Sequence, residues 1–380
     1  MPCGILPPFL LQRIADNTGD PAVMRAVEHT LIVERTLRTE REVRTHHPRD
    51  RGRPPGAGFV PDSLRARTRE RHVRAAPPQT SSAPKRSIHD AQQTSDLPGV
   101  LVRSEGEGPH ADVSVNEAYD GLGATWRLFY EEYGRDSLDA RGLPLVATVH
   151  YEKNYDNAFW DGRQMVFGDG DGRVFGSFTK SVDVIGHELA HGFTQYTAGL
   201  VYVGQSGALN EHVSDVFGVL TAQYIDDVDA GDADWLVGAA LFTDAVQGKA
   251  LRSMIEPGTA FDDPVLGKDP QPGSMSDYVE LPHTQEHDNG GVHINSGIPN
   301  RAFALAARHV GGKAWLTLGP VWFDVMTGGR LEKDADFATF AHLTIEAARE
   351  RYGEDSAEAQ AVAGAWAEVE VAPSSGRMRS

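Results

Sequence analysis

The sequence predicts an α+β protein with two lobes, in which a β-rich N-terminal lobe precedes a helical C-terminal lobe. Two runs typical of strands, Leu143–Tyr151 and Gln164–Gly168, lie in the first half of the chain. Helical periodicity dominates later, as in Gly297–Val310 and Ala335–Tyr352. The run from Ser181 to Thr197 is expected to form a helix at the junction of the two lobes.

Other segments fit the same division. The start of the chain carries a Pro-Pro pair among bulky apolar residues, which favours an extended segment that cannot be a central strand. Residues Asn157–Trp160 are expected to add a further edge of sheet. Additional helices are expected at Ala22–Leu37, Val113–Tyr133, Gly207–Ile225, Trp235–Phe242 and Gly312–Val325.

Charge is unevenly distributed along the 380 residues. The formal net charge of −18 includes +9 over residues 35–86, where 14 Lys/Arg face 5 Asp/Glu, and −25 over residues 87–380. The basic part is rich in Arg, Pro, Ser and Thr and poor in aromatic residues, so it is expected to be a disordered linker. A tether to an anionic surface is the alternative, but no stacking aromatics separate the arginines, so nucleic-acid binding is not expected. The chain is therefore expected to divide into five parts. They are an N-terminal segment (residues 1–34), the basic linker (35–86), the N-terminal lobe with the helix at the junction (87–197), the helical C-terminal lobe (198–373) and a tail (374–380).

A metal-binding pattern begins at His187. His187 and His191 are four residues apart, so on a helix they project from one face and can bind one Zn²⁺. Glu188 lies beside them, placed to accept a proton from a water molecule. Two histidines on an amphipathic helix can also be ordinary core residues. The distinction therefore depends on a third ligand.

A second predicted helix supplies that ligand. Glu211 and Asp215 are also four apart and share a face. Glu211 is expected to complete the zinc site, and Asp215 is expected to accept the free N–H of a zinc-bound histidine. Because this run is independent of the first motif, the two together predict one catalytic zinc ion.

Four separated motifs resemble the thermolysin-like neutral metalloendopeptidases. They are Asn157–Trp160, His187–His191, Gly207–Asp215 and the Asp-Asn-Gly-Gly-Val-His run Asp288–His293. The resemblance covers nearly all of residues 87–373, and the opening Ile-Leu-Pro-Pro-Phe-Leu-Leu resembles the pro-segment of the protealysin-like branch. It implies a two-lobed thermolysin-like fold. It also implies a zinc endopeptidase that prefers bulky apolar residues after the cut bond and is made as a latent precursor with residues 1–34 as its pro-segment.

The resemblance also implies roles for single residues. His187, His191 and Glu211 match zinc ligands, and Glu188 matches the general base. Tyr202 and His293 match residues that donate hydrogen bonds to the oxyanion, and Asp288 matches the carboxylate that orients this histidine. Asn157 and Ala158 match positions that hold the substrate backbone, and Arg252 matches the arginine near the primed-side pocket. The matched positions of an apolar pocket are Phe175, Phe178, Val184, Val237, Leu241 and Leu251.

One departure concerns calcium. Members of the family often hold a pair of calcium ions with several carboxylates, which offset the repulsion between the ions. Asp183 and Asp234 remain in this chain, but matching acidic positions read Ala222, Leu236 and Ala239. A paired calcium site is therefore not expected, although the acidic run 226–234 could hold one ion weakly.

Partners and compartment follow from weaker signals. Protein or peptide substrates and a monomer are expected, and no apolar run is long enough to span a membrane. The resemblance implies secretion, whereas the absence of an ordinary signal peptide favours the cytoplasm. The single cysteine, Cys3, excludes an intrachain disulfide and is either incidental or a thiolate ligand for the zinc. A catalytically silent, protein-binding homologue with a basic arm is the alternative function.

Overall fold

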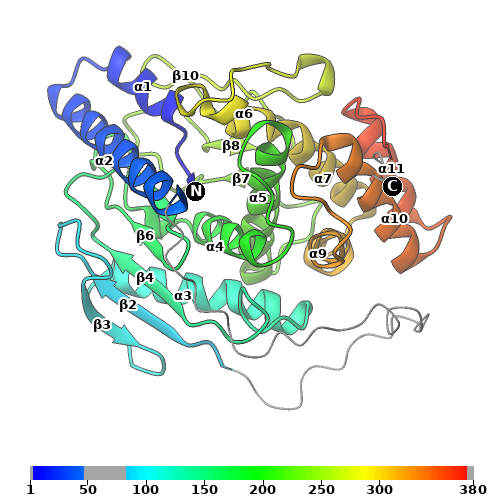
Figure 1. Ribbon diagram of the computed structural model, residues 1–380, viewed down its shortest axis with the longest axis horizontal. Coiled ribbons are helices and arrows are strands. Elements are labelled where there is room, and N and C mark those ends of the chain that lie inside the picture. The colour runs from blue at the N-terminus through cyan, green and yellow to red at the C-terminus, as the bar shows by residue number, and fades with distance from the viewer. Residues whose placement is uncertain (1–2, 47–82, 375–380) are drawn as a thin grey trace.

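A mixed six-stranded sheet and a helical lobe form the protein (Figure 1), whose computed structural model describes residues 3–46 and 83–374. The expected linker lies mainly outside the described residues. The strands follow the order β1-β5-β6-β4-β2-β3, and β4 pairs in parallel with both β2 and β6, whereas the other pairs are antiparallel. Their bounds are β1 Cys3–Gly4, β2 Arg86–Asp90, β3 Val100–Ser104, β4 Leu145–Val149, β5 Ala158–Trp160 and β6 Met165–Phe167.

Strand β1 comes from the N-terminus of the chain and adds to the edge of this sheet, where Cys3 pairs with Trp160. Pro8 then occupies the first turn of α1 (Pro8–Asn17), where the missing N–H of proline costs no hydrogen bond. Helix α2 spans Pro21–His46, so it continues past the expected end at Leu37. In Figure 1 both helices lie along the outside of the molecule, and α1 lies beside β10 (Gly267–Lys268), where Arg13 donates to the carbonyl of Lys268.

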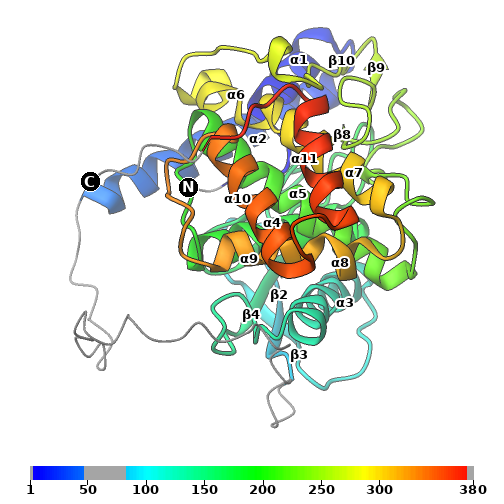
Figure 2. The same ribbon diagram turned by 90° about the vertical axis from the view of Figure 1, so that its right-hand side faces the viewer.

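Helices α4 (Val182–Tyr196) and α5 (Gly204–Asp226) agree closely with the expected pair and pack against each other at the centre of the molecule (Figures 1 and 2). Their contact depends on glycine. A Cβ atom on Gly218 would lie 2.4 Å from the carbonyl oxygen of Asp183 and 3.0 Å from the backbone nitrogen of His187. The bare backbone at Gly218 therefore lets α5 approach α4 beside the metal motif.

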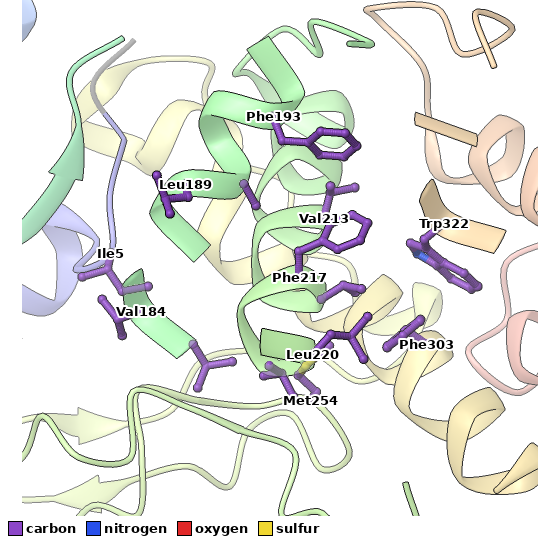
Figure 3. Packing of buried hydrophobic residues seen from close by; sticks show 14 of the residues in the cluster. Ile5, Val184, Leu189, Phe193, Val213, Phe217, Leu220, Met254, Phe303 and Trp322 are labelled. Carbon is purple, nitrogen blue, oxygen red and sulfur yellow. The ribbon is translucent and has the colours of Figure 1, made fainter. Parts of the chain in front are cut away.

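The C-terminal lobe is helical, as expected, around a large aromatic core. Phe193 of α4 and Phe217 of α5 have ring centroids 5.3 Å apart, and Phe303 and Trp322 pack 4.8 Å apart on the far side of α5 (Figure 3). The remaining helices are α3 Val113–Arg127, which contacts the sheet, and α6 Asp288–Asn295, α7 Gly297–Val310, α8 Ala314–Thr317, α9 Gly319–Thr327, α10 Phe337–Tyr352 and α11 Ala357–Glu368.

The expected helix Trp235–Phe242 is wrong. Leu236 and Val237 form β7, which pairs with β8 (Arg252–Ser253), and Gly238 has a φ of +70° that ends the strand. A short apolar run does not distinguish a helix from a buried strand, so periodicity misassigned it. The correction matters for function because this pairing positions Arg252.

One ion-pair cluster ties the sheet lobe together. His150 follows β4, and its ring nitrogens lie 2.7 Å from an oxygen of Asp169 and 2.9 Å from an oxygen of Asp112. The hydrogen bond to Asp169, with the charge of both carboxylates, raises the pKa of His150 to about 9 although partial burial opposes the shift. The imidazolium therefore links the start of α3 to the turn after β6.

Candidate metal centre and substrate cleft

Three buried side chains converge on one point. The Nε2 atoms of His187 and His191 are 3.0 Å apart, and carboxylate oxygens of Glu211 lie 3.5 Å from His187 Nε2 and 3.4 Å from His191 Nε2. Ligands about 2.0–2.1 Å from a tetrahedral zinc ion are separated by roughly 3.3 Å. The three atoms thus have the spacing that zinc requires, and the residues present fit the ion.

Neighbouring groups fix which ring nitrogens face this point. His187 Nδ1 lies 2.8 Å from an oxygen of Asp215, and His191 Nδ1 lies 2.9 Å from the amide oxygen of Asn210. Burial lowers the pKa of His191 to about 3, so its ring is neutral at neutral pH. Burial by itself would raise the pKa of Glu211, but His293 and the two motif histidines lower it to about 2. Two histidines and a glutamate are the donor set of a catalytic zinc site.

Glu188 lies against the sheet edge. Its Oε2 accepts the backbone N–H of Trp160 at 2.8 Å, whereas Oε1 is buried and has no hydrogen-bond partner among the described residues. Burial, reinforced by the charge of Glu211, raises the pKa of Glu188 well above its ordinary value. A buried carboxyl group with one oxygen available is suited to exchanging a proton with a small molecule in the cleft.

Tyr202 and His293 both contact the carboxylate of Glu211. Tyr202 Oη donates to Glu211 and lies 3.2 Å from His293 Nε2, and His293 Nδ1 lies 2.6 Å from an oxygen of Asp288. Burial would lower the pKa of His293, but Asp288 and Glu211 outweigh it and raise the pKa. Four successive residues, Asp288 to Gly291, have φ values between +50° and +89°, which Asp, Asn and Gly tolerate best. The Asp-Asn-Gly-Gly sequence is therefore what folds the chain back so that Asp288 reaches His293.

The N-terminal strand of the chain lies in this cleft. His293 Nε2 is 3.2 Å from the carbonyl oxygen of Gly4, and the N–H of Ile5 donates to the carbonyl of Ala158 at 3.1 Å. The N–H of Leu6 donates to Asn157 Oδ1 at 3.0 Å. Both expected backbone-binding residues thus hold residues 5 and 6, and the peptide bond between Gly4 and Ile5 lies next to the metal motif.

Arg252 and Val184 lie beside Ile5. Arg252 donates from Nη1 to the carbonyl of Ile5 at 3.3 Å and makes two hydrogen bonds to Asp215, at 2.7 and 2.9 Å. Ile5 is fully buried and is seen next to Val184 in Figure 3. The other expected pocket residues are buried in the same core cluster as Ile5, and they are Phe175, Phe178, Val237, Leu241 and Leu251.

Sequence reasoning did not identify Glu34 of α2. Its side chain is only 3% exposed and accepts hydrogen bonds from Tyr155 Oη at 2.5 Å and Asn157 Nδ2 at 3.0 Å. Thr30, one turn earlier, accepts the N–H of Asp156 at 2.9 Å. A buried acidic residue so far from the cleft in sequence carries no local signal, although Thr30 and Glu34 are four apart on one helix face.

Comparison with known proteins agrees with this geometry. Residues 80–195 match the family model of the thermolysin metallopeptidase catalytic domain, and residues 198–371 match that of its alpha-helical domain. The chain belongs to the thermolysin metallopeptidase family. Its curated relatives include an extracellular metalloprotease of Pectobacterium carotovorum subsp. carotovorum, 46% identical over 92% of this chain and 91% of that protein. Another is protease PrtS of Photorhabdus sp., 43% identical over 96% of this chain and 91% of that one.

A solved structure resembles the whole chain. The precursor of protealysin, a metalloproteinase from Serratia proteamaculans, superposes with a TM-score of 0.82 and 45% identity. The match covers 97% of this chain and 100% of that one. The chain is therefore a zinc metalloendopeptidase of the protealysin branch, with the two-lobed thermolysin-like fold that the sequence predicted. Within the described residues, no helix is long and apolar enough to cross a membrane.

Proposed function

We propose that the enzyme cuts peptide bonds on the N-terminal side of bulky apolar residues, and that its own N-terminal strand displays the substrate register. The observation that carries this proposal is the set of hydrogen bonds to Gly4, Ile5 and Leu6 in the cleft. In that register the carbonyl of Gly4 takes the place of the bond under attack. The buried side chain of Ile5 then takes the place of the residue after the cut.

In the proposed reaction, His187, His191 and Glu211 hold the zinc ion. When bound, zinc acts as a Lewis acid and lowers the pKa of a water molecule to about 7. Glu188 accepts the proton of the attacking water through its available Oε1, then delivers it to the leaving amine. Tyr202 and His293 donate hydrogen bonds to the carbonyl oxygen as its negative charge develops, at roughly 2.7–4 kcal/mol for each donor in comparable sites.

The remaining residues hold the substrate in place. Asn157, Ala158 and Arg252 bind its backbone, because they bind residues 5 and 6 of the chain in the same way. Asp288 orients His293 through Nδ1. Such positioning converts a collision into a reaction within one complex, which is a large part of enzymatic rate enhancement.

Latency follows from the same register, with residues 1–34 as an inhibitory pro-segment and residues 35–86 as its linker to the lobes 87–197 and 198–373 and the tail 374–380. We propose that a protease removes the pro-segment by cutting the linker near Lys85 and Arg86. Arg86 is the first residue of β2, and its guanidinium pairs with Glu105 at 2.6 Å. Processing should therefore leave Arg86 in the mature chain. We further propose a secreted monomer, in line with the name of the extracellular relative from Pectobacterium.

The assignment of Glu188 is tested by Glu188→Gln in the processed enzyme. The amide keeps the size of the side chain and its acceptor for Trp160 but cannot take a proton. We expect full zinc content by elemental analysis, with casein hydrolysis reduced by roughly 10²–10⁴-fold. Activity close to that of the unchanged enzyme would refute the role of Glu188. Loss of zinc together with activity would mean that Glu188 serves the metal site instead.

A further inference from the structure

A buried hydrogen-bond chain runs from the metal centre into the helical core. It starts at Asp215 of α5, which is fully buried and accepts hydrogen bonds from His187, Arg252 and Asn300 of α7. The amide of Asn300 lies 2.8 Å from Asp215 Oδ2 through Nδ2 and 2.8 Å from His212 Nδ1 through Oδ1. The chain thus connects a carboxylate beside the metal to a histidine on the far face of α5.

The far end of the chain is Trp322 of α9. Its indole Nε1 lies 2.7 Å from His212 Nε2, and the side chains of Asn300, His212 and Trp322 are all buried to 0% exposure. None of these three side chains is part of the group that can bind the metal. Burying polar side chains costs free energy unless each of them is hydrogen-bonded, and all three are hydrogen-bonded here.

The donor at the far end sets the direction of every hydrogen bond. An indole N–H only donates, so His212 Nε2 must accept and its Nδ1 carries the proton. His212 then donates to the amide oxygen of Asn300, and Asn300 donates from Nδ2 to Asp215. Reversing the amide would place oxygen against the carboxylate and N–H against N–H. Asp215 is left as a pure acceptor, so His187 carries its proton on Nδ1 and presents the lone pair of Nε2 to the metal point.

We propose that Trp322, His212 and Asn300 are positioning residues of the metal centre, which hold Asp215 so that it fixes the tautomer of His187. The inference rests on the proposed role of His187 as a ligand. Arg252 also holds Asp215, but the same guanidinium binds the carbonyl of Ile5 in the cleft. The hydrogen bonds that begin at Trp322 end at Asn300, which gives Asp215 a donor that does not depend on what occupies the cleft.

Matched tryptophan variants test this proposal. Trp366 is also fully buried, and its Nε1 donates to Thr344 at 2.9 Å, away from Asp215. Trp322→Phe and Trp366→Phe each remove a buried indole donor and leave a similar space. The zinc dissociation constant is measured by competition with a chelator, which does not depend on catalysis, and the melting temperature of the metal-free protein reports the structural cost.

We expect Trp322→Phe to weaken zinc binding by about tenfold, at the lower end of the 10–100-fold typical of groups behind metal ligands. Trp366→Phe should stay within about twofold of the unchanged protein. Asn300→Asp keeps the shape of the side chain but replaces the donor to Asp215 by an acceptor, so it should reach the upper end of that range. It also decides the matter if Trp322→Phe does not accumulate as folded protein.

Two further readouts separate the possible failures. In ¹⁵N-labelled protein, the shift of His187 Nδ1 should report a proton in the unchanged chain and lose that signature in Asn300→Asp. Equal zinc affinity in both tryptophan variants, with Asn300→Asp unchanged, would overturn the positioning role. His187→Ala is the separate test of the ligand set: if it retains stoichiometric zinc, the proposed metal site itself is wrong.

Discussion

Replacing Glu34 should release the enzyme from its own N-terminal segment. Its buried carboxylate accepts hydrogen bonds from Tyr155 and Asn157, and Asn157 in turn binds Leu6. Glu34 therefore connects α2 to Asn157, the side chain that binds the backbone of Leu6 in the cleft. Because Glu34 belongs to the proposed pro-segment, its loss should not alter the processed enzyme.

The magnitude follows from the two hydrogen bonds. Hydrogen bonds to charged groups contribute about 1.5–3 kcal/mol each, and water recovers part of this when α2 detaches. Glu34→Ala should then weaken docking of the segment by about 2–4 kcal/mol, which is roughly 30–1,000-fold in the equilibrium between docked and released states. Glu34→Gln keeps an acceptor and should lose about 1 kcal/mol, because a neutral hydrogen bond is weaker than a charged one.

The assay is the initial rate on a small fluorogenic peptide, measured on full-length protein that mass spectrometry shows to be uncut. The ratio of this rate to that of the same sample after complete processing should rise in the order Glu34→Gln, then Glu34→Ala. Glu28→Gln is the matched control, since Glu28 lies on the same helix and is exposed. If uncut Glu34→Ala is as latent as the unchanged precursor, α2 does not contribute to inhibition through Glu34.

Two other predictions concern stability. Because the pKa of His150 is raised from 6.5 to about 9, its stabilisation is fully present below pH 6.5 and is lost as the pH rises through about 9. The melting temperature should therefore fall between pH 7 and 10 by more in the unchanged protein than in His150→Asn. Both oxygens of Asp183 are bonded to protein donors, Ser181 Oγ at 2.6 Å and the N–H of Gly238 at 2.5 Å, so melting curves with and without millimolar calcium should nearly coincide. A ligand at 100 times its Kd adds about 2.7 kcal/mol, so a shift of many degrees would reveal a calcium site around residues 226–234.

Features encoded by local spacing could be predicted from the sequence. The interval of four between His187 and His191, and again between Glu211 and Asp215, places each pair on one helix face whatever the rest of the chain does. The structure brings these two faces together in a buried contact. Local periodicity failed at Trp235–Phe242, where pairing with β8 rather than helix propensity decides the conformation.

Features that depend on distant contacts could not be predicted in this way. Glu34 is 123 residues from Asn157, and Trp322 is 110 residues from His212. Nothing in the neighbourhood of either residue indicates its partner. His212 lies inside the motif Gly207–Asp215, but the motif gives it no role and nothing near it in the sequence points to Trp322. The role of such a buried polar side chain can be assigned only when the structure shows its hydrogen-bond partner.

Asp215 explains why these distant contacts matter to one site. Its two oxygens accept hydrogen bonds from His187, Arg252 and Asn300. His187 faces the metal point, Arg252 also binds the strand in the cleft, and Asn300 belongs to the helical core. Burial would raise the pKa of Asp215, but Arg252 and His187 hold it well below its ordinary value, so the group remains a charged acceptor. Changes in the cleft, at the metal and in the core therefore act on one shared carboxylate. Substitutions at Arg252 and Asn300 should accordingly not add in their effects, because each removes a donor on which the other depends.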